Sequence, residues 1–442
     1  MLRFALVRRV LSFLGLAPAA LCGGFDAPPG FNVETHPDAG GLAHVLPDGS
    51  QLLAAGSFGS QSLLRRLPDG TLLDFAGPFG SLAGLAQSPR TGELVVGESF
   101  GAVPLLVLRD LNGDLDCLDA GESTPHPAAL PVLSNGAAPL PYDLAFRPGT
   151  DELYLIGATP FGVSPTLGVV VRIAGGSASV FADGLGYSGG LAFHGDTLYA
   201  GDLDTGTFAG RVVALRDLDA DGDALDAGEA TDFAAGLTGA NGLAVTQDGR
   251  VLVSGLFDFG TLTGSVGLAL PDGDGDGLSD GVDEGWLTGF VFPGSLFLQE
   301  GAGGLQPGVS GDALLAVGDF GLAGNVLVRT APLAGTQLSG TVANDAAFTL
   351  TVTGEPGAGV LLALSLDTQG VTLPGLGDLG LGFGATHVIL VLPALDAGGQ
   401  SSLKVVLHGV DALVGRSFVA QGFTLQGGEI GLGDALLLEI AP

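Results

Sequence analysis

The sequence predicts an all-β protein, with a six-bladed β-propeller in residues 30–333 and a small C-terminal β-sandwich in residues 340–442. Two observations predict this fold. A phrase centred on Gly-Leu-Ala recurs six times before residue 300, and the pattern changes to strand-like runs without that phrase after residue 333. The 78 glycines among 442 residues agree with many tight turns, and the repeats show no helical period.

The repeated phrase carries the propeller prediction. Successive copies lie 43 to 59 residues apart, and turn signals such as Pro-Asp-Gly split the chain between them into short strand-like runs. About four short strands per ~40 to 50 residues are typical of one propeller blade, so six copies predict six blades. The leucines of the six copies are Leu42, Leu85, Leu144, Leu191, Leu243 and Leu296.

The two ends of the repeat predict how the ring closes. The first strand, "FNVETH", has no blade of its own before it, whereas the sixth blade is one strand short after "NVLVRTAPL". We therefore expect residues 31–34 to complete the sixth blade. Such a pairing removes the exposed edge that an open sheet would present.

The C-terminal hundred residues predict a separate sandwich. Six strand-like runs follow one another there without acidic loops or blade phrases, which favours a small β-sandwich. The runs are "AFTLTVTG", "GVLLALSL", "HVILVLPAL", "SLKVVLHG", "SFVAQGFTL" and "ALLLEIAP".

The N-terminus predicts export. Residues 1–22 combine Arg3, Arg8 and Arg9 with a following apolar stretch and small residues, as a signal peptide does. Cleavage fits after Ala19, Ala20 or Cys22, and lipid attachment at Cys22 stays open although Leu21 is large for such a site. No later run is long enough to span a membrane. We expect a secreted protein, either extracellular or at the cell surface, that is a monomer without a membrane span.

The charge excludes some partners. The net charge of −32 repels nucleic acid and anionic lipid but suits divalent cations. We therefore expect no nucleic-acid partner, and an extracellular protein or a glycan as the ligand. The mature chain keeps Cys117 as a small buried side chain rather than half of a disulfide.

Three acidic loops predict calcium as the cofactor. Alternating aspartates with a glycine at position six surround one point with oxygen atoms, which is the flexible cage that Ca²⁺ prefers over Mg²⁺. The third loop places acids at positions one, three, five, nine and twelve, namely Asp272, Asp274, Asp276, Asp280 and Asp283. The second loop has Asp217, Asp219, Asp221 and, at position thirteen, Glu229; the first has Asp110, Asn112, Asp114 and Glu122, without a glycine at position six.

These loops resemble EF-hand-like calcium loops, but strand-like runs rather than helices precede them. We therefore expect structural calcium cages between blade strands. The alternative is a set of solvated acidic turns without metal. The six histidines show no zinc spacing, and the matches to the nucleophile-elbow and dinucleotide patterns lack the helix that both motifs require.

The stretch "GLTGANGLAVTQDGRVLVSG" resembles blades of NHL-repeat and SMP-30/gluconolactonase propellers. That resemblance implies Asn241 as a metal-binding residue of a lactonase. The family's acidic partners would lie near Ala39 and Pro293, which are not acidic, and Asn-Gly is also a strong turn pair. We therefore expect Asn241 in a turn and a non-catalytic binding or scaffold protein. The alternative is a divergent propeller enzyme, either a lactone hydrolase or a quinone-dependent sugar dehydrogenase.

Overall fold

The computed structural model describes most of residues 43–301 and parts of the remainder. The predicted signal peptide, residues 1–22, lies outside the described residues. The described residues are 27–28, 31–36, 43–57, 59–160, 163–165, 167–204, 207, 209–258, 263–291, 293–301, 304–305, 313–319, 324–330, 334–340, 342, 347–354, 359–365, 371–373, 377–379, 387–396, 400–406, 417–426, 429–432 and 436–441.

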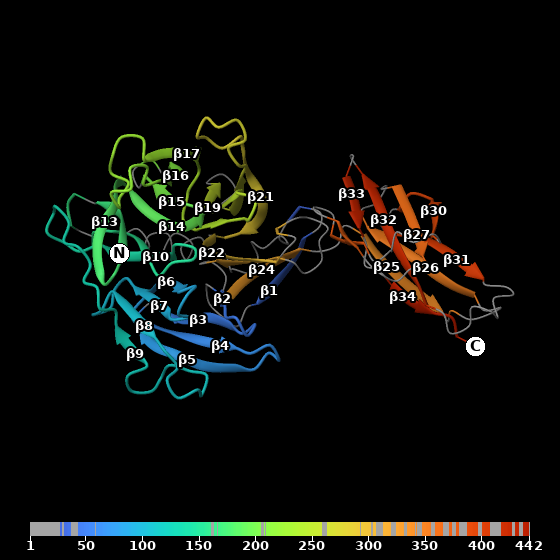
Figure 1. Ribbon diagram of the computed structural model, residues 1–442, viewed down its shortest axis with the longest axis horizontal. Helices are drawn as coiled ribbons and strands as arrows, with labels where there is room; N and C mark the ends of the chain where they lie inside the picture. Colours follow the sequence, from blue (N-terminus) through green and yellow to red (C-terminus); the bar gives the residue numbers. More distant parts are fainter. Residues whose placement is uncertain are drawn as a thin grey trace, which may run out of the picture. The chain divides into compact units, whose positions relative to one another are not determined.

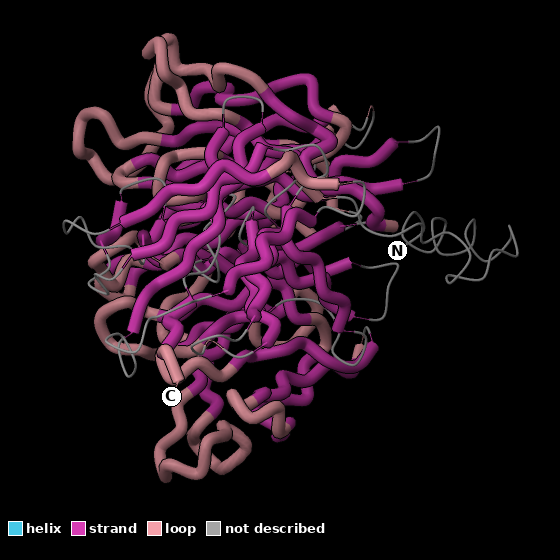
Figure 2. Tube along the Cα trace, turned by 90° about the vertical axis from the view of Figure 1, so that its right-hand side faces the viewer, coloured by secondary structure: helices cyan, strands magenta, loops and turns pink. Residues whose placement is uncertain are grey.

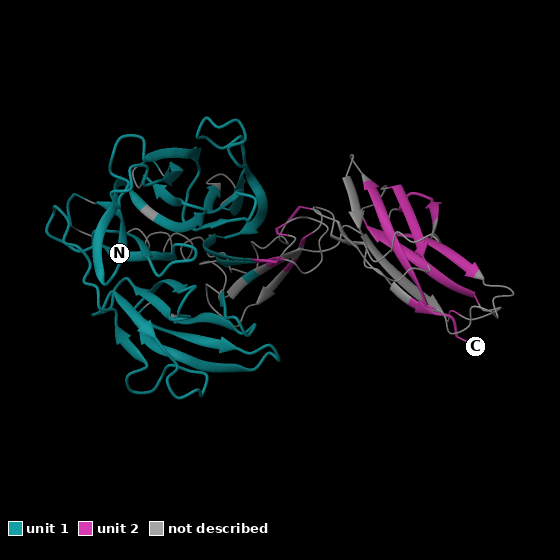
Figure 3. Ribbon diagram, viewed as in Figure 1, with its two compact units in different colours: residues 1–26, 34–299, 315–327 teal, residues 27–33, 300–314, 328–442 magenta. Residues whose placement is uncertain are grey.

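Every regular element in this part of the chain is a β-strand, so the all-β prediction is confirmed (Figure 2). Within the same residues, none forms a helix of the length and apolarity that a membrane crossing requires. The chain divides into two compact units, coloured in Figure 3. Unit 1 comprises residues 1–26, 34–299 and 315–327, and unit 2 comprises residues 27–33, 300–314 and 328–442.

Six four-stranded sheets follow one another along the chain, and the first five are antiparallel (Figure 1). Sheet 1 contains β2 (Ala43–Val45), β3 (Gln51–Ser57), β4 (Ser60–Arg66) and β5 (Leu72–Phe79); sheet 2 contains β6 (Leu82–Gln87), β7 (Leu94–Glu98), β8 (Leu105–Leu108) and β9 (Ser123–Pro125). Sheet 3 contains β10 (Leu140–Phe146), β11 (Leu153–Ala158), β12 (Gly168–Ala174) and β13 (Ser177–Leu185); sheet 4 contains β14 (Tyr187–His194), β15 (Thr197–Leu203), β16 (Gly210–Leu215) and β17 (Ala230–Leu237). Sheet 5 contains β18 (Leu243–Val245), β19 (Val251–Asp258), β20 (Thr263–Ala269) and β21 (Val282–Phe290).

Sheet 6 contains the first strand of the chain. Its order is β1 (Phe31–His36), β24 (Gly324–Thr330), β23 (Ala313–Asp319) and β22 (Pro293–Glu300), so β1 is hydrogen-bonded to β24. The expected pairing of residues 31–34 with the last of the repeated strand sets is therefore confirmed. As the sequence indicated, β22–β24 supply only three strands, and β1 adds the fourth that each of sheets 1 to 5 has from its own segment.

The sheets pack face to face through buried aliphatic and aromatic side chains. Ile156, Val170 and Phe181 of sheet 3 share a core with Leu198 and Val213 of sheet 4. Equivalent cores join sheet 1 to sheet 2, sheet 2 to sheet 3 and sheet 4 to sheet 5. Because both faces of the middle strands are covered, β7 and β11 are buried along their whole length instead of alternating between core and solvent.

The first strands of the six sheets meet in a closed ring. His44 of β2 contacts both neighbours: its ring packs on Phe297 of β22 with centroids 5.1 Å apart, and its Nε2 lies 3.4 Å from Oε1 of Gln87 in β6. The backbone N–H of Leu191 in β14 donates to Oδ2 of Asp143 in β10, at 2.9 Å. The other three junctions are close backbone approaches at Gly84, Gly190 and Gly242.

These approaches explain the glycine in the repeated phrase. A Cβ on Gly84 would lie 2.9 Å from the Cα of Asp143, and one on Gly190 would lie 2.3 Å from the backbone nitrogen of Leu243. A Cβ on Gly242 would lie 2.3 Å from the carbonyl oxygen of Gly294. Neighbouring first strands thus come closer than any side chain allows, because a non-bonded carbon needs about 3.5 Å or more.

Unit 2 contains two further sheets over one core. The first is β25 (Ala334–Gly340), β26 (Ala347–Gly354) and β31 (Gln400–Val406); the second is β30 (His387–Leu392), β27 (Gly359–Ser365), β32 (Ser417–Gln426) and β33 (Glu429–Leu432), with β34 (Leu436–Glu439) also paired to β32. Phe348 and Leu350 of β26 pack with Leu362 of β27 and Ala420 of β32. The six predicted runs are all strands, and β25, β33 and the hairpin of β28 (Val371–Leu373) and β29 (Gly377–Leu379) add to them.

Candidate calcium-binding loops

The three acidic loops occupy equivalent places in their sheets. Each one connects the third strand of a sheet to the fourth, from β8 to β9, from β16 to β17 and from β20 to β21. As the sequence indicated, the elements on either side are strands and not helices. Only sheets 2, 4 and 5 carry such a loop among the described residues.

The aspartate at position one organises each loop in the same way. Its Oδ2 accepts a hydrogen bond from the backbone N–H at position six, at 3.0 Å for Asp110, 3.1 Å for Asp217 and 2.9 Å for Asp272. The position-six residue has a positive φ in all three loops, 78° at Leu115, 101° at Gly222 and 89° at Gly277. The first loop therefore adopts the glycine conformation although a leucine occupies the position.

Each loop is also attached to the preceding sheet. The backbone N–H at position eight donates to the carbonyl oxygen of a phenylalanine in the fourth strand of that sheet, at 2.7 Å in every case. The three pairs are Cys117 with Phe75 of β5, Ala224 with Phe181 of β13, and Ser279 with Phe233 of β17. Each loop thus connects its own sheet to the sheet before it, on the side of the sheets that carries their fourth strands.

Position eight requires a small side chain because it lies at this junction. Cys117 is 3% exposed and belongs to the core of sheets 1 and 2, so the prediction of a small buried thiol is confirmed. Burial, followed by the charges of Glu122, Asp110 and Asp116, raises the pKa of the Cys117 thiol to about 12. The thiol is therefore protonated at neutral pH and is not a nucleophile.

A buried glutamate closes each of the first two loops. Glu122 and Glu229 are each 2% exposed, and each accepts two backbone hydrogen bonds. In the second loop, the N–H of Leu218 donates to Oε1 of Glu229 at 2.7 Å, and the N–H of Asp226 donates to Oε2 at 3.1 Å. In the first loop, the N–H groups of Leu111 and Asp119 donate to Oε1 and Oε2 of Glu122 at 2.8 and 3.1 Å. The glutamate at position thirteen is thus hydrogen-bonded into the loop, although it lies one residue beyond the usual position of the closing acid.

Most of the predicted ligands converge within their loops, on one group of acids in the first and third loops and on two overlapping groups in the second. Four groups of three acids have oxygen atoms within 4.8 Å of one another among the described residues, and every group lies in an acidic loop. Oxygen ligands at 2.3–2.6 Å from one Ca²⁺ can lie about 5 Å apart on opposite sides of the ion, so the spacing fits this metal. The groups are Asp110, Asp114 and Glu122; Asp217, Asp219 and Glu229; Asp219, Asp221 and Asp226; and Asp272, Asp274 and Asp276.

Three predicted ligands lie outside these groups. Asn112 donates through Nδ2 to Asp114 and Asp119, which keeps it within the first loop. In the third loop, Oδ2 of Asp280 accepts from the N–H of Gly273 at 3.2 Å. Asp283 already belongs to β21, where it is exposed and accepts from the N–H of Gly285 at 3.0 Å.

The sequence prediction overlooked two aspartates at position ten of the loops. Asp226 joins Asp219 and Asp221 in one of the acidic groups, and Asp119 accepts from the amide of Asn112 at 2.7 Å. A signal for both was present, because the segment Leu-Asp-Ala-Gly-Glu ends the first loop at 118–122 and the second at 225–229. Identical residues at the same offset in two loops indicate a shared role.

An arginine of the preceding sheet also binds each of the first two loops. Arg65 Nη1 donates to the carbonyl of Leu115 and Arg172 Nη1 to that of Gly222, both at 3.1 Å. The two arginines are held by acids outside the loops, since Nη2 of Arg65 lies 2.6 Å from Asp48 and Nη2 of Arg172 lies 2.5 Å from Glu152. Their charges partly compensate the carboxylates at the loops.

The second loop contains two of the four acidic groups, and both include Asp219. The N–H of Asp221 lowers the pKa of Asp219, but burial and the charges of Asp221, Glu229 and Asp226 outweigh it and raise that pKa overall. A cation among these groups would relieve the repulsion that raises the pKa.

Asn241, the residue implied by the lactonase resemblance, lies at the first strand of sheet 5. Its backbone N–H donates to the carbonyl of Ser254 at 2.8 Å, and the N–H of Ser254 donates to the carbonyl of Gly242 at 2.9 Å. These bonds extend the pairing of β18 with β19, so the expectation of a turn at Asn241 is wrong. The reason lies in the sheet, because both the backbone and the hydroxyl of Ser254 in β19 bind this segment; the N–H of Gly242 donates to the Ser254 hydroxyl at 2.9 Å.

No protein-family model and no curated protein sequence matches the chain. Among solved structures, a gluconolactonase from Xanthomonas campestris is 16% identical, with a TM-score of 0.45 over 71% of this chain and 93% of that one. A calcium-binding regucalcin from Agrobacterium tumefaciens is also 16% identical, with a TM-score of 0.42 over 66% and 92%. A luciferin-regenerating enzyme is 11% identical, with a TM-score of 0.45 over 69% and 96%. At these values neither an activity nor a ligand of this chain follows from the three proteins.

Proposed function

We propose that calcium ions bound by the three acidic loops fasten neighbouring blades of a six-bladed β-propeller, and that the protein is a non-catalytic binding or scaffold protein. The observation that carries this proposal is the position-eight hydrogen bond, which joins every acidic loop to the sheet before it at the same 2.7 Å. A cage at that place acts on the packing between two sheets, which is a structural role.

Electrostatics supports the role of the metal. Two carboxylates ~4 Å apart repel by about 4 kcal/mol at an effective dielectric constant of 20. The second loop brings five acids into two overlapping groups that share Asp219. A divalent cation reverses the sign of this interaction, and the ligands would be Asp217, Asp219, Asp221, Asp226 and Glu229 in that loop. Calcium would supply charge neutralisation and no chemistry of its own.

The wider organisation is part of the same proposal. Residues 30–333 form the propeller and residues 340–442 the sandwich domain, after a signal peptide that directs the chain to the outside of the cell. The ring of first strands, with its contacts at His44, Asp143 and the phrase glycines, supports a closed propeller. A scaffold of this kind presents loops to a ligand, for which we propose an extracellular protein or a glycan.

Melting curves test the calcium proposal. The purified protein, stripped with chelator and then measured in chelator or in millimolar calcium, should melt at a higher temperature with calcium. Calorimetric titration should show binding, which Asp217→Asn with Asp219→Asn reduces. Coinciding curves together with no heat of binding would show that the loops are only solvated acidic turns.

Turnover of sugar lactones decides between the scaffold and the enzyme. We expect no hydrolysis in the presence of calcium or zinc, because every group of three convergent acids in the described residues lies in an acidic loop and not beside Asn241. Lactone hydrolysis that disappears in Asn241→Ala would favour the divergent enzyme instead.

A further inference from the structure

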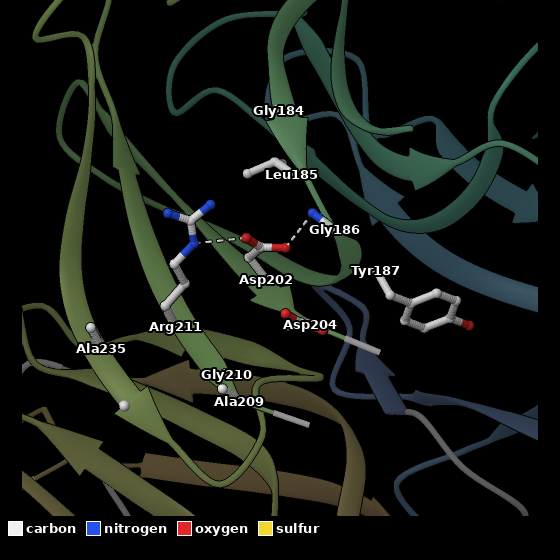
Figure 4. Close-up of a pocket in the computed structure, with 11 residues that line it drawn as sticks. Gly184, Leu185, Gly186, Tyr187, Asp202, Asp204, Ala209, Gly210, Arg211 and Ala235 are labelled. Atoms are coloured by element: carbon white, nitrogen blue, oxygen red, sulfur yellow. Dashed lines mark hydrogen bonds and ion pairs between the residues drawn. The ribbon is translucent and has the colours of Figure 1, made fainter. Parts of the chain in front are cut away.

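A cavity of about 540 Å³ opens in unit 1 between the end of β13 and the strands β15–β17. It lies away from the acidic loops. Its charged lining consists of Asp202, Asp204 and Arg211, and glycines at 184, 186, 210 and 236 form much of the remaining wall (Figure 4). The volume is within the range of small-molecule sites, about 300–1,000 Å³.

One ion pair is built into this cavity. Nε of Arg211 lies 2.7 Å from Oδ2 of Asp202, and the other oxygen of Asp202 accepts from the N–H of Gly186 at 2.6 Å. The side chain of Asp202 is only 7% exposed, whereas that of Arg211 is 39% exposed. Asp202 therefore orients the guanidinium, and each of its two oxygens accepts one hydrogen bond, as Figure 4 shows.

Arg211 retains donors for a ligand. A guanidinium has five N–H donors. Arg211 donates through Nε to Asp202 and through Nη1 to Asp232, the latter at 2.8 Å. The exposed carboxylate of Asp204 adds an acceptor to the same cavity. The ring of Tyr187 points away from the ion pair and packs against Tyr142, with centroids 4.9 Å apart, so it does not fill the space (Figure 4).

The charges select the class of ligand. An anion would meet one arginine that is already paired with two carboxylates. A cation would find Asp202 and Asp232 already paired with Arg211, and only the exposed Asp204 left to bind it. An apolar ligand would remove water from the ion pair without offering it a hydrogen bond, which is costly. A neutral ligand with many hydroxyl groups avoids all three costs, because a hydroxyl both donates to carboxylates and accepts from guanidinium.

The glycines allow such a ligand to reach the backbone. Gly184 and Gly236 have φ values of 74° and 75°, and a Cβ on either would meet nothing within 4 Å. Both glycines lie near the ends of strands β13 and β17, where the register of the strand pairing shifts, and both are exposed. Their peptide groups are accessible to a small hydrogen-bonding molecule.

We propose that this cavity, with Arg211, Asp202 and Asp204, is a binding site for a neutral carbohydrate. This inference rests on the proposed role as a binding protein, for which a glycan is one of the two proposed ligands. It adds where on the protein the glycan binds and that the glycan is uncharged. Asp202 is a positioning residue, and Arg211 and Asp204 contact the sugar.

Isothermal titration with defined trisaccharides tests the site. The probes are maltotriose, cellotriose and chitotriose as neutral sugars, trigalacturonate as an anion and the chitosan trimer as a cation. We expect at least one neutral sugar to bind, and Ala235→Trp, at an exposed residue of the cavity wall, to weaken that sugar at least tenfold. Thr231→Trp, at the other end of β17 and also exposed, is the matched control and should leave the affinity unchanged.

Two further variants separate binding from folding. Arg211→Met keeps the aliphatic stem but removes all donors. Asp204→Asn keeps an oxygen that can accept from the N–H of Thr207, which lies 3.2 Å from Oδ1 of Asp204, and removes the negative charge without touching the ion pair. Both should lower the affinity, and Asp204→Asn should keep the melting temperature. No binding by any neutral trisaccharide, binding of only the charged probes, or binding unaffected by Ala235→Trp would each overturn the site.

The calcium melting curve, measured on the same sample, distinguishes this inference from the proposed function. Sugar binding without a calcium-dependent shift of the melting temperature would contradict the calcium proposal and support the carbohydrate site. A calcium-dependent shift without sugar binding would support the calcium proposal and contradict the carbohydrate site.

Discussion

The second and third acidic loops have similar sequences but are completed differently. The third loop fits the spacing of an EF-hand-like loop better, with acids at positions nine and twelve, yet only its first three aspartates converge. The second loop has its last acid one residue late, and Glu229 nevertheless closes it from a buried position. The strand that follows explains the difference. β17 begins at residue 230, after Glu229, whereas β21 begins at residue 282 and already includes Asp283.

This comparison shows what a spacing pattern can and cannot predict. Alternating aspartates at positions one, three and five lie close because a tight loop brings them together within five residues. The closing acid is different, because the pleat of a strand fixes the direction of its side chain once the strand has begun. A regular spacing therefore predicts the start of a loop better than its end.

Removing the buried glutamate should have the largest effect. Glu229→Ala leaves the N–H groups of Leu218 and Asp226 without their acceptor. Both hydrogen bonds are partly buried, and a lost hydrogen bond to a charged group costs about 1.5–3 kcal/mol. We expect the free energy of unfolding to fall by about 3 kcal/mol in urea titrations. Glu229→Gln keeps one acceptor and should lose about half as much, whereas Asp283→Ala in the third loop should change little. Equal losses for Glu229→Ala and Asp283→Ala would remove the distinction between the loops.

Loss of one calcium ion should have the next largest effect. Each independent site adds about 1.4 kcal/mol at a calcium concentration ten times its dissociation constant. Asp217→Asn with Asp219→Asn and, separately, Asp272→Asn with Asp274→Asn should each remove one bound ion in equilibrium dialysis. The thermal shift should fall more for the second-loop pair, since Asp219 belongs to two acidic groups. If the thermal shift instead fell more for the third-loop pair, the spacing of the aspartates would predict the affinity for calcium better than the buried glutamate does.

A side chain at position six should cost less than a lost ion. At Gly222 a Cβ would lie 2.6 Å from Nη1 of Arg172, and φ is 101°. We expect Gly222→Ala to lower stability by about 1 kcal/mol through backbone strain and displacement of the arginine. Gly277→Ala in the third loop, where a Cβ meets nothing within 4 Å, should cost only the strain. Calorimetric melting of both variants would measure the difference, and identical losses would show that Arg172 does not constrain the second loop.

The smallest effect concerns the first loop. Leu115 adopts a φ of 78°, which is unfavourable for leucine, and its side chain is 39% exposed. Leu115→Gly should therefore raise the free energy of unfolding by ~0.5 kcal/mol, because relief of strain exceeds the added entropy of the unfolded chain. The same urea titration measures it. A loss of stability would mean that the leucine side chain contributes packing to the loop.

Local pattern predicted much of this protein. The strands of both units follow from short apolar runs and turn signals, and the three loops follow from aspartates that are neighbours in sequence. The pairing of β1 with β24 followed from counting strands in each repeat. These inferences succeed because each depends on residues within one strand or one loop, or on the need of a sheet edge for a partner.

Contacts between sheets decided the remainder. The glycine of the repeated phrase allows first strands to approach within the space of a side chain. Asn241 is not in a turn, because its backbone binds Ser254 of β19. Three further features could not be predicted from the spacing of residues along the chain. They are the hydrogen bond from position eight to a phenylalanine of the preceding sheet, the burial of Glu122 and Glu229, and the pairing of Asp202 with Arg211 in the cavity. Their distances arise only when adjacent sheets pack, since packing sets which backbone groups lose water and therefore require a partner.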